Sequence, residues 1–143
     1  MIAVRHAGIV VSDMEAALGF YCGQLGFQVA RRMVETGPFI ATLLGMHGAE
    51  VETAKLSGAD TAMIELLHFR NPAPRPRGDL TLNRLGPTHV ALTVTDLDGL
   101  YRRLTQQEIS FVAPPHVSPD GKAKVAFCRD PEGNYLELVE MVG

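Results

Sequence analysis

The sequence predicts an α+β fold made of two tandem βαβββ modules, and three observations support this prediction. A strand-and-helix pattern that begins at residue 6 recurs at residue 89, an offset of 83. A strand pattern around residue 65 recurs around residue 137, an offset of 72, and a proline-rich segment separates the two copies. Because repetition of whole patterns indicates repeated structural units, the 143 residues are expected to form one domain with two similar halves.

Each half opens with a strand that has two different faces. Residues 6–13 read His-Ala-Gly-Ile-Val-Val-Ser-Asp, and residues 89–96 read His-Val-Ala-Leu-Thr-Val-Thr-Asp. Alternate side chains of a strand point to opposite faces. One face therefore carries a histidine with mostly small residues, and the other is aliphatic and needs a helix to cover it. The aliphatic faces consist of Ala7, Ile9 and Val11 in the first copy and of Val90, Leu92 and Val94 in the second.

An amphipathic helix is predicted after each opening strand. The i, i+3, i+4, i+7 spacing of one buried helix face is met by Met14, Ala17, Leu18 and Tyr21, and again by Leu97, Leu100, Tyr101 and Leu104. Ser12 before Glu15 forms a capping box, and Thr95 before Asp98 forms a weaker one. Gly26 suits a left-handed end to the first helix, whereas residues 106–108 offer no matching glycine.

About three antiparallel strands are expected to complete each half. The closing strands read Met-Ile-Glu-Leu-Leu at 63–67 and Tyr-Leu-Glu-Leu-Val at 135–139, each after a segment rich in turn residues. Residues 122–129 and 135–140 therefore predict a hairpin. The offsets of 83 and 72 differ by 11, so the first half holds 11 extra residues, expected around residues 36–50. These extra residues are interpreted as either a pocket wall or part of the core.

Residues 71–86 predict an extended linker. They contain Pro72, Pro74, Pro76 and Gly78, which neither a helix nor a central strand tolerates. The first module is therefore expected to span residues 1–70 and the second module residues 87–143.

Composition excludes several classes of function. Thirteen Lys and Arg against sixteen Asp and Glu give a formal charge of -3, so no broad basic face for nucleic acid is expected. The apolar runs are short and interrupted by charges, which argues against a membrane span and a secretory leader. The two cysteines, Cys22 and Cys128, are expected to be reduced thiols in a cytoplasmic protein.

One histidine and one glutamate in each half are predicted to point away from the core. A carboxylate between aliphatic residues in a strand is costly to bury unless it is paired or bound to a cation. Two imidazoles and two carboxylates together form a donor set that suits Zn, Ni, Co, Fe or Mn. The alternative is that the glutamates form salt bridges and the histidines are ordinary surface residues, but the repetition favours a metal site. The four residues are His6, Glu65, His89 and Glu137.

Taken together, these motifs resemble the vicinal-oxygen-chelate superfamily, which includes glyoxalase I, methylmalonyl-CoA epimerase, extradiol dioxygenases, and fosfomycin and bleomycin resistance proteins. The resemblance covers nearly the whole chain. It implies an open, cupped mixed sheet around a divalent metal ion, a small-molecule substrate and often a homodimer. The stretches that carry it are residues 6–13, Phe20-Tyr21 with Leu25-Gly26-Phe27, residues 64–66, residues 89–92, and Asp130-Pro131-Glu132-Gly133-Asn134 with residues 136–138.

The resemblance also implies roles for individual residues. His6, Glu65, His89 and Glu137 fall on the four metal-ligand positions of glyoxalase I, whereas extradiol dioxygenases use the equivalents of His6, His89 and Glu137. The complete set favours a lyase or an isomerase (epimerase) that acts on a small carbonyl substrate through a metal-stabilised enolate. Glu137 is the expected proton-abstracting base, and Glu65 is the second catalytic carboxylate.

Two departures from bacterial glyoxalase I bear on the substrate. Val10 and Phe69 stand where that enzyme commonly has the arginine and asparagine that contact glutathione, so an apolar or aromatic-tolerant pocket is expected. Two other functions remain open: an Fe(II) extradiol-type dioxygenase and a non-catalytic small-molecule binding or resistance protein. The site forms either within one chain or between modules of two chains. Tyr135, on the face of Glu137, either contacts substrate or packs across strands.

Overall fold

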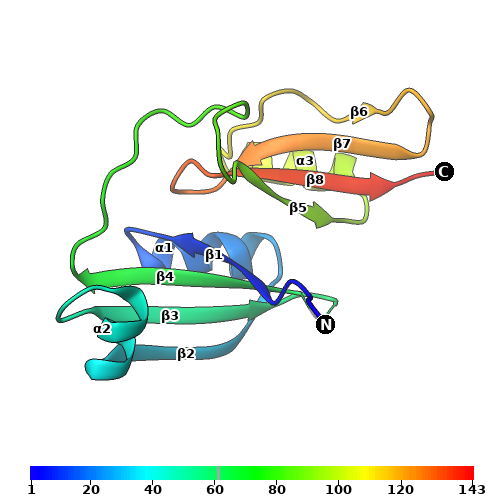
Figure 1. The fold of residues 1–143 in the computed structure, drawn as a ribbon. Coiled ribbons are helices and arrows are strands. Elements are labelled where there is room, and N and C mark those ends of the chain that lie inside the picture. The colour runs from blue at the N-terminus through cyan, green and yellow to red at the C-terminus, as the bar shows by residue number, and fades with distance from the viewer. Residues whose placement is uncertain (61) are drawn as a thin grey trace. The chain divides into compact units, whose positions relative to one another are not determined.

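The structure, a computed structural model, describes residues 1–60 and 62–143. It divides into two compact units, Met1–Arg77 and Gly78–Gly143, each with a four-stranded mixed sheet (Figure 1). The predicted α+β fold of two βαβββ modules is confirmed. No helix in the described ranges has the length and apolar character needed to span a membrane.

The first unit contains one more helix than the βαβββ pattern requires. Its sheet has the strand order β1-β4-β3-β2, in which β1 runs parallel to β4 and the other neighbours are antiparallel. The elements are β1 (His6–Val10), α1 (Met14–Leu18), the π-helical segment η1 (Gly19–Gln24), β2 (Gln28–Thr36), α2 (Pro38–Leu44), β3 (Glu50–Ser57) and β4 (Met63–Asn71).

The second unit repeats this topology without the extra helix. Its sheet has the order β5-β8-β7-β6, with β5 parallel to β8. The register repeats as well, because Gly8 lies opposite Glu65 and Ala91 lies opposite Glu137. The elements are β5 (His89–Thr93), α3 (Leu97–Gln106), β6 (His116–Val117), β7 (Ala123–Arg129) and β8 (Tyr135–Met141).

The predicted strand faces are confirmed in both units. Ile9 and Val11 are buried, while His6, Gly8 and Val10 are exposed. In β5 the aliphatic positions are half-buried, whereas the histidine face is exposed. The core of each unit lies on the aliphatic face, where α1 packs on β4 and α3 packs on β8. Its fully buried side chains include Tyr21, Leu56 and Leu66 in the first unit and Leu97, Leu104, Leu136 and Leu138 in the second.

The predicted helix starts are wrong by one residue. The N-caps are Asp13 and Asp96, whose carboxylates accept hydrogen bonds from the amides of Ala16 (3.0 Å) and Gly99 (3.1 Å). An aspartate one position after the serine or threonine caps the amide one residue further along the helix, and its charged oxygen is favoured at the positive end of the helix. The left-handed end at Gly26 is confirmed by its φ of 83°.

Helix α2 occupies the predicted 11-residue insertion and lies on the sheet face opposite α1 (Figure 1). Pro38 begins α2, and Gly45, with φ of 66°, ends it. Ile40 packs in a cluster with Ala49 and Val51. Half-buried Leu44, Leu67 and Phe69 pack against this cluster.

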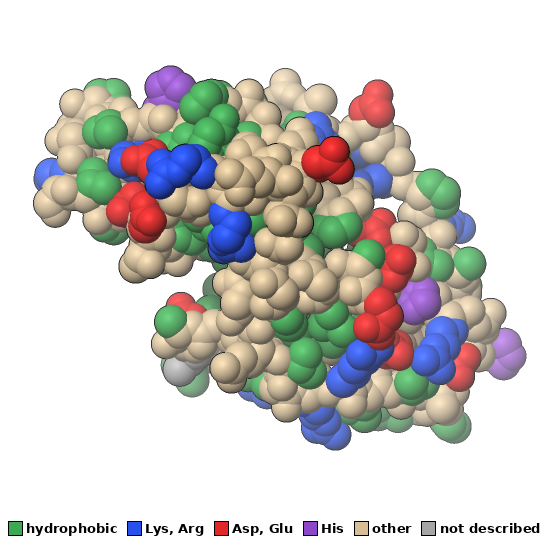
Figure 2. All heavy atoms as spheres, turned by 180° about the vertical axis from the view of Figure 1, so that it is seen from behind, with side chains coloured by type: hydrophobic (Ala, Val, Ile, Leu, Met, Phe, Trp, Pro, Cys, Tyr) green, Lys and Arg blue, Asp and Glu red, His purple; other side chains and the backbone are tan. Residues whose placement is uncertain are grey.

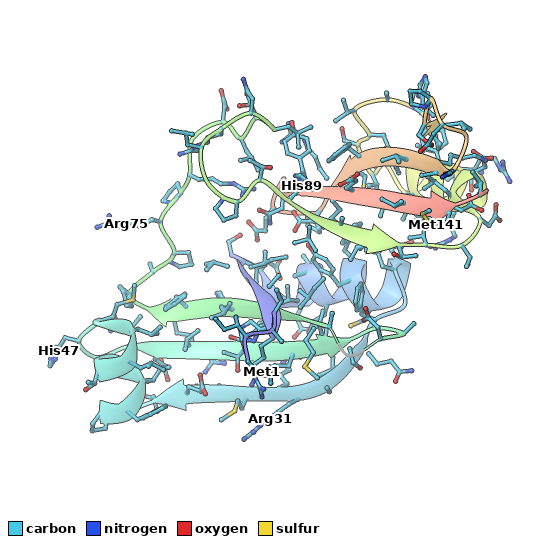
Figure 3. All side chains as sticks on the ribbon, turned by 45° about the vertical axis from the view of Figure 1, so that its right-hand side comes forward. Met1, Arg31, His47, Arg75, His89 and Met141 are labelled. Atoms are coloured by element: carbon cyan, nitrogen blue, oxygen red, sulfur yellow. The ribbon has the colours of Figure 1, made fainter. Side chains whose placement is uncertain are left out.

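The segment between β4 and β5 contains no helix or strand. Strand β4 extends beyond the predicted 63–67 to Asn71, the first residue of the predicted linker, and the boundary between the two units falls at Arg77. The side chain of Arg75 projects from this segment in Figure 3. On the face drawn in Figure 2, acidic, basic and apolar side chains are interspersed.

Candidate functional site

The first unit brings His6 and Glu65 together on the sheet face opposite α1. His6 is at the start of β1, and Glu65 lies opposite Gly8 on the parallel neighbour β4. His6 is thus diagonal to Glu65 on the same face, and its Nε2 lies 3.8 Å from Glu65 Oε2. Because Gly8 has no side chain, nothing from β1 stands directly over the carboxylate.

The second unit repeats this pair with the same strand geometry. His89 begins β5 (Figure 3), and Glu137 lies opposite Ala91 on β8, so that His89 Nε2 is 3.3 Å from Glu137 Oε2. The Thr88 hydroxyl lies 2.9 Å from His89 Nδ1, and Phe127 packs edge-on against the imidazole. A partner on Nδ1 orients the ring and leaves Nε2 to face the carboxylate.

The distances within each pair fit two ligands of one divalent ion. Donor atoms about 2.1 Å from an ion are about 3.0 Å apart at a right angle and about 3.4 Å apart at the tetrahedral angle. The 3.3 Å separation in the second unit falls within this range, and the 3.8 Å separation in the first unit needs a small side-chain adjustment. The donor types and their spacing in each unit therefore fit half of an N2O2 metal site.

The complete four-residue set remains a prediction. Within either unit, the described residues contain no group of three or more His, Cys, Asp or Glu side chains placed to hold one ion. Each unit supplies two of the four predicted ligands. The two glutamates also differ in their surroundings: the Glu65 side chain is 13% exposed and that of Glu137 is 26% exposed.

Lys55 is a residue of this face that the sequence analysis missed. It lies opposite Glu65 in the β3–β4 register, and its Nζ is 4.0 Å from Glu65 Oε2. Phe127 holds the equivalent position opposite Glu137 in the second unit. The 72-residue offset between the closing strands also aligns Lys55 with Phe127. Lys55 could have been found from this alignment together with the faces of the inner strands, which the sequence pattern alone does not assign.

Arg129 was also missed, and it bears on the role of Tyr135. The Arg129 guanidinium donates a hydrogen bond to the Tyr135 hydroxyl and lies 4.2 Å from the centre of its ring. Tyr135 is 7% exposed and lies opposite His89 in the β5–β8 register. Of the two predicted roles for Tyr135, these contacts favour packing beside the histidine.

The cysteines supply no nucleophile to this face. Both thiols are free, as predicted. Burial, with a smaller contribution from the nearby Asp130 carboxylate, raises the pKa of Cys128 to about 12, and burial also raises the pKa of Cys22. Both are therefore protonated at neutral pH, whereas the thiolate is the reactive form.

Apolar side chains, Val10 and Phe69, occupy the two positions at which bacterial glyoxalase I commonly contacts glutathione. Val10 is exposed on the His6 face of β1. Phe69 shares the Glu65 face of β4 and packs against the cluster beneath α2. The insertion therefore places an apolar wall, formed by α2 with Leu67 and Phe69, on the same face as the candidate ligand Glu65.

Comparisons with known proteins show similar chains among both curated sequences and solved structures. A curated "Probable lactoylglutathione lyase" from Synechocystis sp. is 29% identical over 136 residues, covering 94% of this chain and 92% of the relative. A "2-epi-5-epi-valiolone epimerase" from Actinomyces sp. is 26% identical over 148 residues, covering 98% and 80%. The crystal structure of a glyoxalase family protein from Bacillus cereus aligns with a TM-score of 0.91 at 26% identity, covering 100% of this chain and 96% of that one.

The family follows from a match over most of the chain. Residues 3–138 match the family model described as Glyoxalase/Bleomycin resistance protein/Dioxygenase superfamily. This match includes both His–Glu pairs, the first βαβββ module and the second as far as Leu138 in β8, and it confirms the resemblance inferred from the repeated motifs. The protein belongs to the Glyoxalase/Bleomycin resistance protein/Dioxygenase superfamily.

Proposed function

We propose that this protein is a divalent-metal-dependent lyase or isomerase of the glyoxalase type, with His6, Glu65, His89 and Glu137 as the ligands of one ion. The observation that carries the proposal is the repeated His–Glu pair, with donor atoms 3.8 and 3.3 Å apart at the same strand register. The names of the similar proteins, two lactoylglutathione lyases and an epimerase, support proton-transfer chemistry.

The two glutamates have different roles in this proposal. A divalent ion held by the four residues would supply positive charge beside the substrate oxygen on which negative charge develops. Glu137 is the more exposed carboxylate, and no lysine of the described residues pairs with it, so it is the base that removes the proton next to the carbonyl. Glu65 is the less exposed carboxylate and lies 3.8 Å from His6 Nε2 and 4.0 Å from Lys55 Nζ, so it is the carboxylate that stays a ligand. A carboxylate then returns the proton to the substrate, so the reaction consumes no net proton.

The proposed substrate is a small carbonyl compound with an apolar part. Phe69 and α2 form an apolar wall on the Glu65 face where a glutathione-dependent enzyme commonly places an amide. A glutathione adduct carries charged and amide groups, which would meet an apolar surface there without hydrogen-bond partners. We also propose that the protein is cytoplasmic and forms a homodimer. Light scattering would measure its oligomeric state.

Metal analysis of the purified protein tests the proposal. We expect one Zn, Ni, Co, Fe or Mn ion per site in the unmodified protein and at least about tenfold weaker binding in His6→Ala and in Glu137→Ala. His116→Ala is the matched control, because His116 is exposed on β6 and lies 2.6 Å from the Pro114 carbonyl oxygen. Unchanged metal content in both test variants would refute the proposal.

An Fe(II) extradiol-type dioxygenase is the second candidate. The observation in its favour is Lys55, which partly compensates Glu65 without a metal and so suits a site with only His6, His89 and Glu137 as ligands. Oxygen uptake with a catechol in the Fe(II)-loaded protein, retained in Glu65→Gln, would select this function. Binding of small molecules without any metal would instead indicate a non-catalytic resistance protein.

A further inference from the structure

The Glu65 face of the first unit carries a pair of cations that the proposed function does not use. Arg31 on β2 lies opposite Lys55 on β3, and Lys55 lies opposite Glu65 on β4. Residues directly opposite each other in antiparallel strands share a face. The three side chains thus form a row of two positive charges and one negative charge.

A β-bulge places Arg31 in this row. Val29 pairs with Leu56 and Arg31 pairs with Lys55, so Ala30 is an extra residue in β2. Without the bulge, Ala30 would lie opposite Lys55 and Arg31 would face the helix side. The next residue confirms the direction, because Arg32 contacts Glu15 of α1 and Glu52 on the helix side. Bulges often re-aim a side chain beside a functional site.

The contacts of this pair leave an excess of positive charge. The 4.0 Å distance between Lys55 Nζ and Glu65 Oε2 exceeds a charged hydrogen bond of about 2.8 Å. By contrast, Lys124 Nζ lies 2.7 Å from Asp98 Oδ2 on the helix side of the second unit. Among the described residues Lys55 forms no hydrogen bond and Arg31 no ion pair. Two like charges directly opposite each other destabilise a sheet, and in this row Glu65 supplies one negative charge against two positive charges.

The position of Lys55 favours an anion that belongs to the substrate. Its side chain is 34% exposed, so a small molecule can reach the ammonium. On one side of it is the candidate ligand Glu65, and further along the same face are Leu67 and Phe69 of the apolar wall. A charge in this place is costly for an apolar substrate and favourable for an acidic one. In the second unit Phe127 takes the equivalent place, so the cation is specific to the first half.

We propose that Lys55, supported by Arg31, binds a carboxylate of the substrate beside Glu65, which makes the substrate a small carbonyl acid rather than a neutral carbonyl compound. This inference rests on the proposed function and deepens it by naming the substrate class. Lys55 is thereby a specificity-determining residue. A carboxylate next to a carbonyl brings oxygen atoms both to the ammonium and to an ion held by Glu65.

Binding of pyruvate and of its neutral ester, methyl pyruvate, to the Co(II)-loaded protein tests the inference. The visible Co(II) spectrum reports metal binding and ligand binding separately. We expect Lys55→Met to weaken pyruvate binding about tenfold, the usual effect of losing one charge-assisted contact. Methyl pyruvate binding should not change, and Lys55→Arg should stay within about threefold of the unmodified protein. Lys122→Met, an exposed lysine of the second unit, is the control.

Each other outcome overturns the inference in a distinguishable way. If Co(II) binds normally and Lys55→Met affects both ligands equally or neither, the role of Lys55 is refuted while the metal proposal stands. If the unmodified protein binds no Co(II), both proposals fail together. Tighter binding of inorganic phosphate than of pyruvate, lost in Lys55→Met, would refute the carboxylate as the recognised group. If Lys55→Met does not fold, Arg31→Met on the edge strand replaces it, with an expected weakening of about threefold.

Discussion

Replacing Asp130 by alanine is expected to lower the unfolding free energy by about 3–5 kcal/mol. Asp130 is 5% exposed in the turn between β7 and β8. Its Oδ1 accepts hydrogen bonds from the amides of Glu132 (3.0 Å) and Asn134 (2.8 Å), and its Oδ2 accepts one from Asn134 Nδ2 (2.8 Å). Each bond to a charged group contributes about 1.5–3 kcal/mol, and the sum is discounted because bonds that share one carboxylate are not additive.

The conservative variant separates hydrogen bonding from simple loss of packing. Asp130→Asn keeps an oxygen for the two backbone amides but turns an NH2 group toward Asn134 Nδ2, where two donors meet. Its expected cost is about 1–2 kcal/mol, intermediate between the unmodified protein and Asp130→Ala. The control is Asp60→Ala in the corresponding turn of the first half, where an exposed Asp60 accepts one bond from the Ala62 amide at 3.2 Å. That change should cost less than about 1 kcal/mol.

Urea unfolding followed by circular dichroism on the full chain measures these differences. The expected loss is largest for Asp130→Ala, smaller for Asp130→Asn and smallest for Asp60→Ala. A loss below about 1 kcal/mol for Asp130→Ala would show that the turn does not depend on the carboxylate. Equal losses for Asp130→Ala and Asp130→Asn would show that the second oxygen, rather than the shared one, carries the effect.

Three further predictions concern single side chains. Because the pKa of Cys128 is raised to about 12 from its ordinary value of 9.0, the stability that its protonated thiol contributes is complete below pH 9 and is lost as the pH rises toward 12. In urea titrations, Cys128→Ala should therefore remove a decline of about 1.4 kcal/mol per pH unit in this window, and identical slopes would contradict the assignment. Glu108 has φ of 62° just after α3, a conformation that glycine adopts without strain. Glu108→Gly should therefore raise the unfolding free energy by about 1 kcal/mol and raise the thermal midpoint, and a lower midpoint would disprove this. Glu52→Gln should cost about 1–2 kcal/mol in urea unfolding because the buried Glu52 carboxylate accepts bonds from Arg32 (2.9 Å) and Arg70 (3.0 Å); a cost near zero would show that these ion pairs contribute little.

Much of the fold was predictable because local patterns and the repeat agree. Alternation in residues 6–11 and 89–94 placed each histidine on the face away from the core, and the two closing strands placed each glutamate likewise. The helix starts were misplaced by one residue because Ser12 and Asp13, and likewise Thr95 and Asp96, are adjacent capping residues that the pattern alone does not rank.

Other features depend on pairing between strands that are distant in sequence. The bulge at Ala30 exists only relative to β3, so the sequence of β2 does not reveal which face Arg31 takes. In the same way, Lys55 becomes a neighbour of Glu65 only through the antiparallel β3–β4 register. The length of the insertion was visible as a difference of offsets, but the side of the sheet that α2 covers follows from the packing of Ile40 and Phe69.

The sequence by itself therefore determined the modular fold, the two strand faces and the four candidate ligand residues, since alternation and repetition are properties of the chain alone. Only the tertiary structure decided which side chains stand next to these residues: Lys55 beside Glu65, Thr88 and Phe127 beside His89, and the α2 wall on the Glu65 face. The physical reason is that strand register and packing are set by contacts between segments far apart in the chain, which no local pattern encodes.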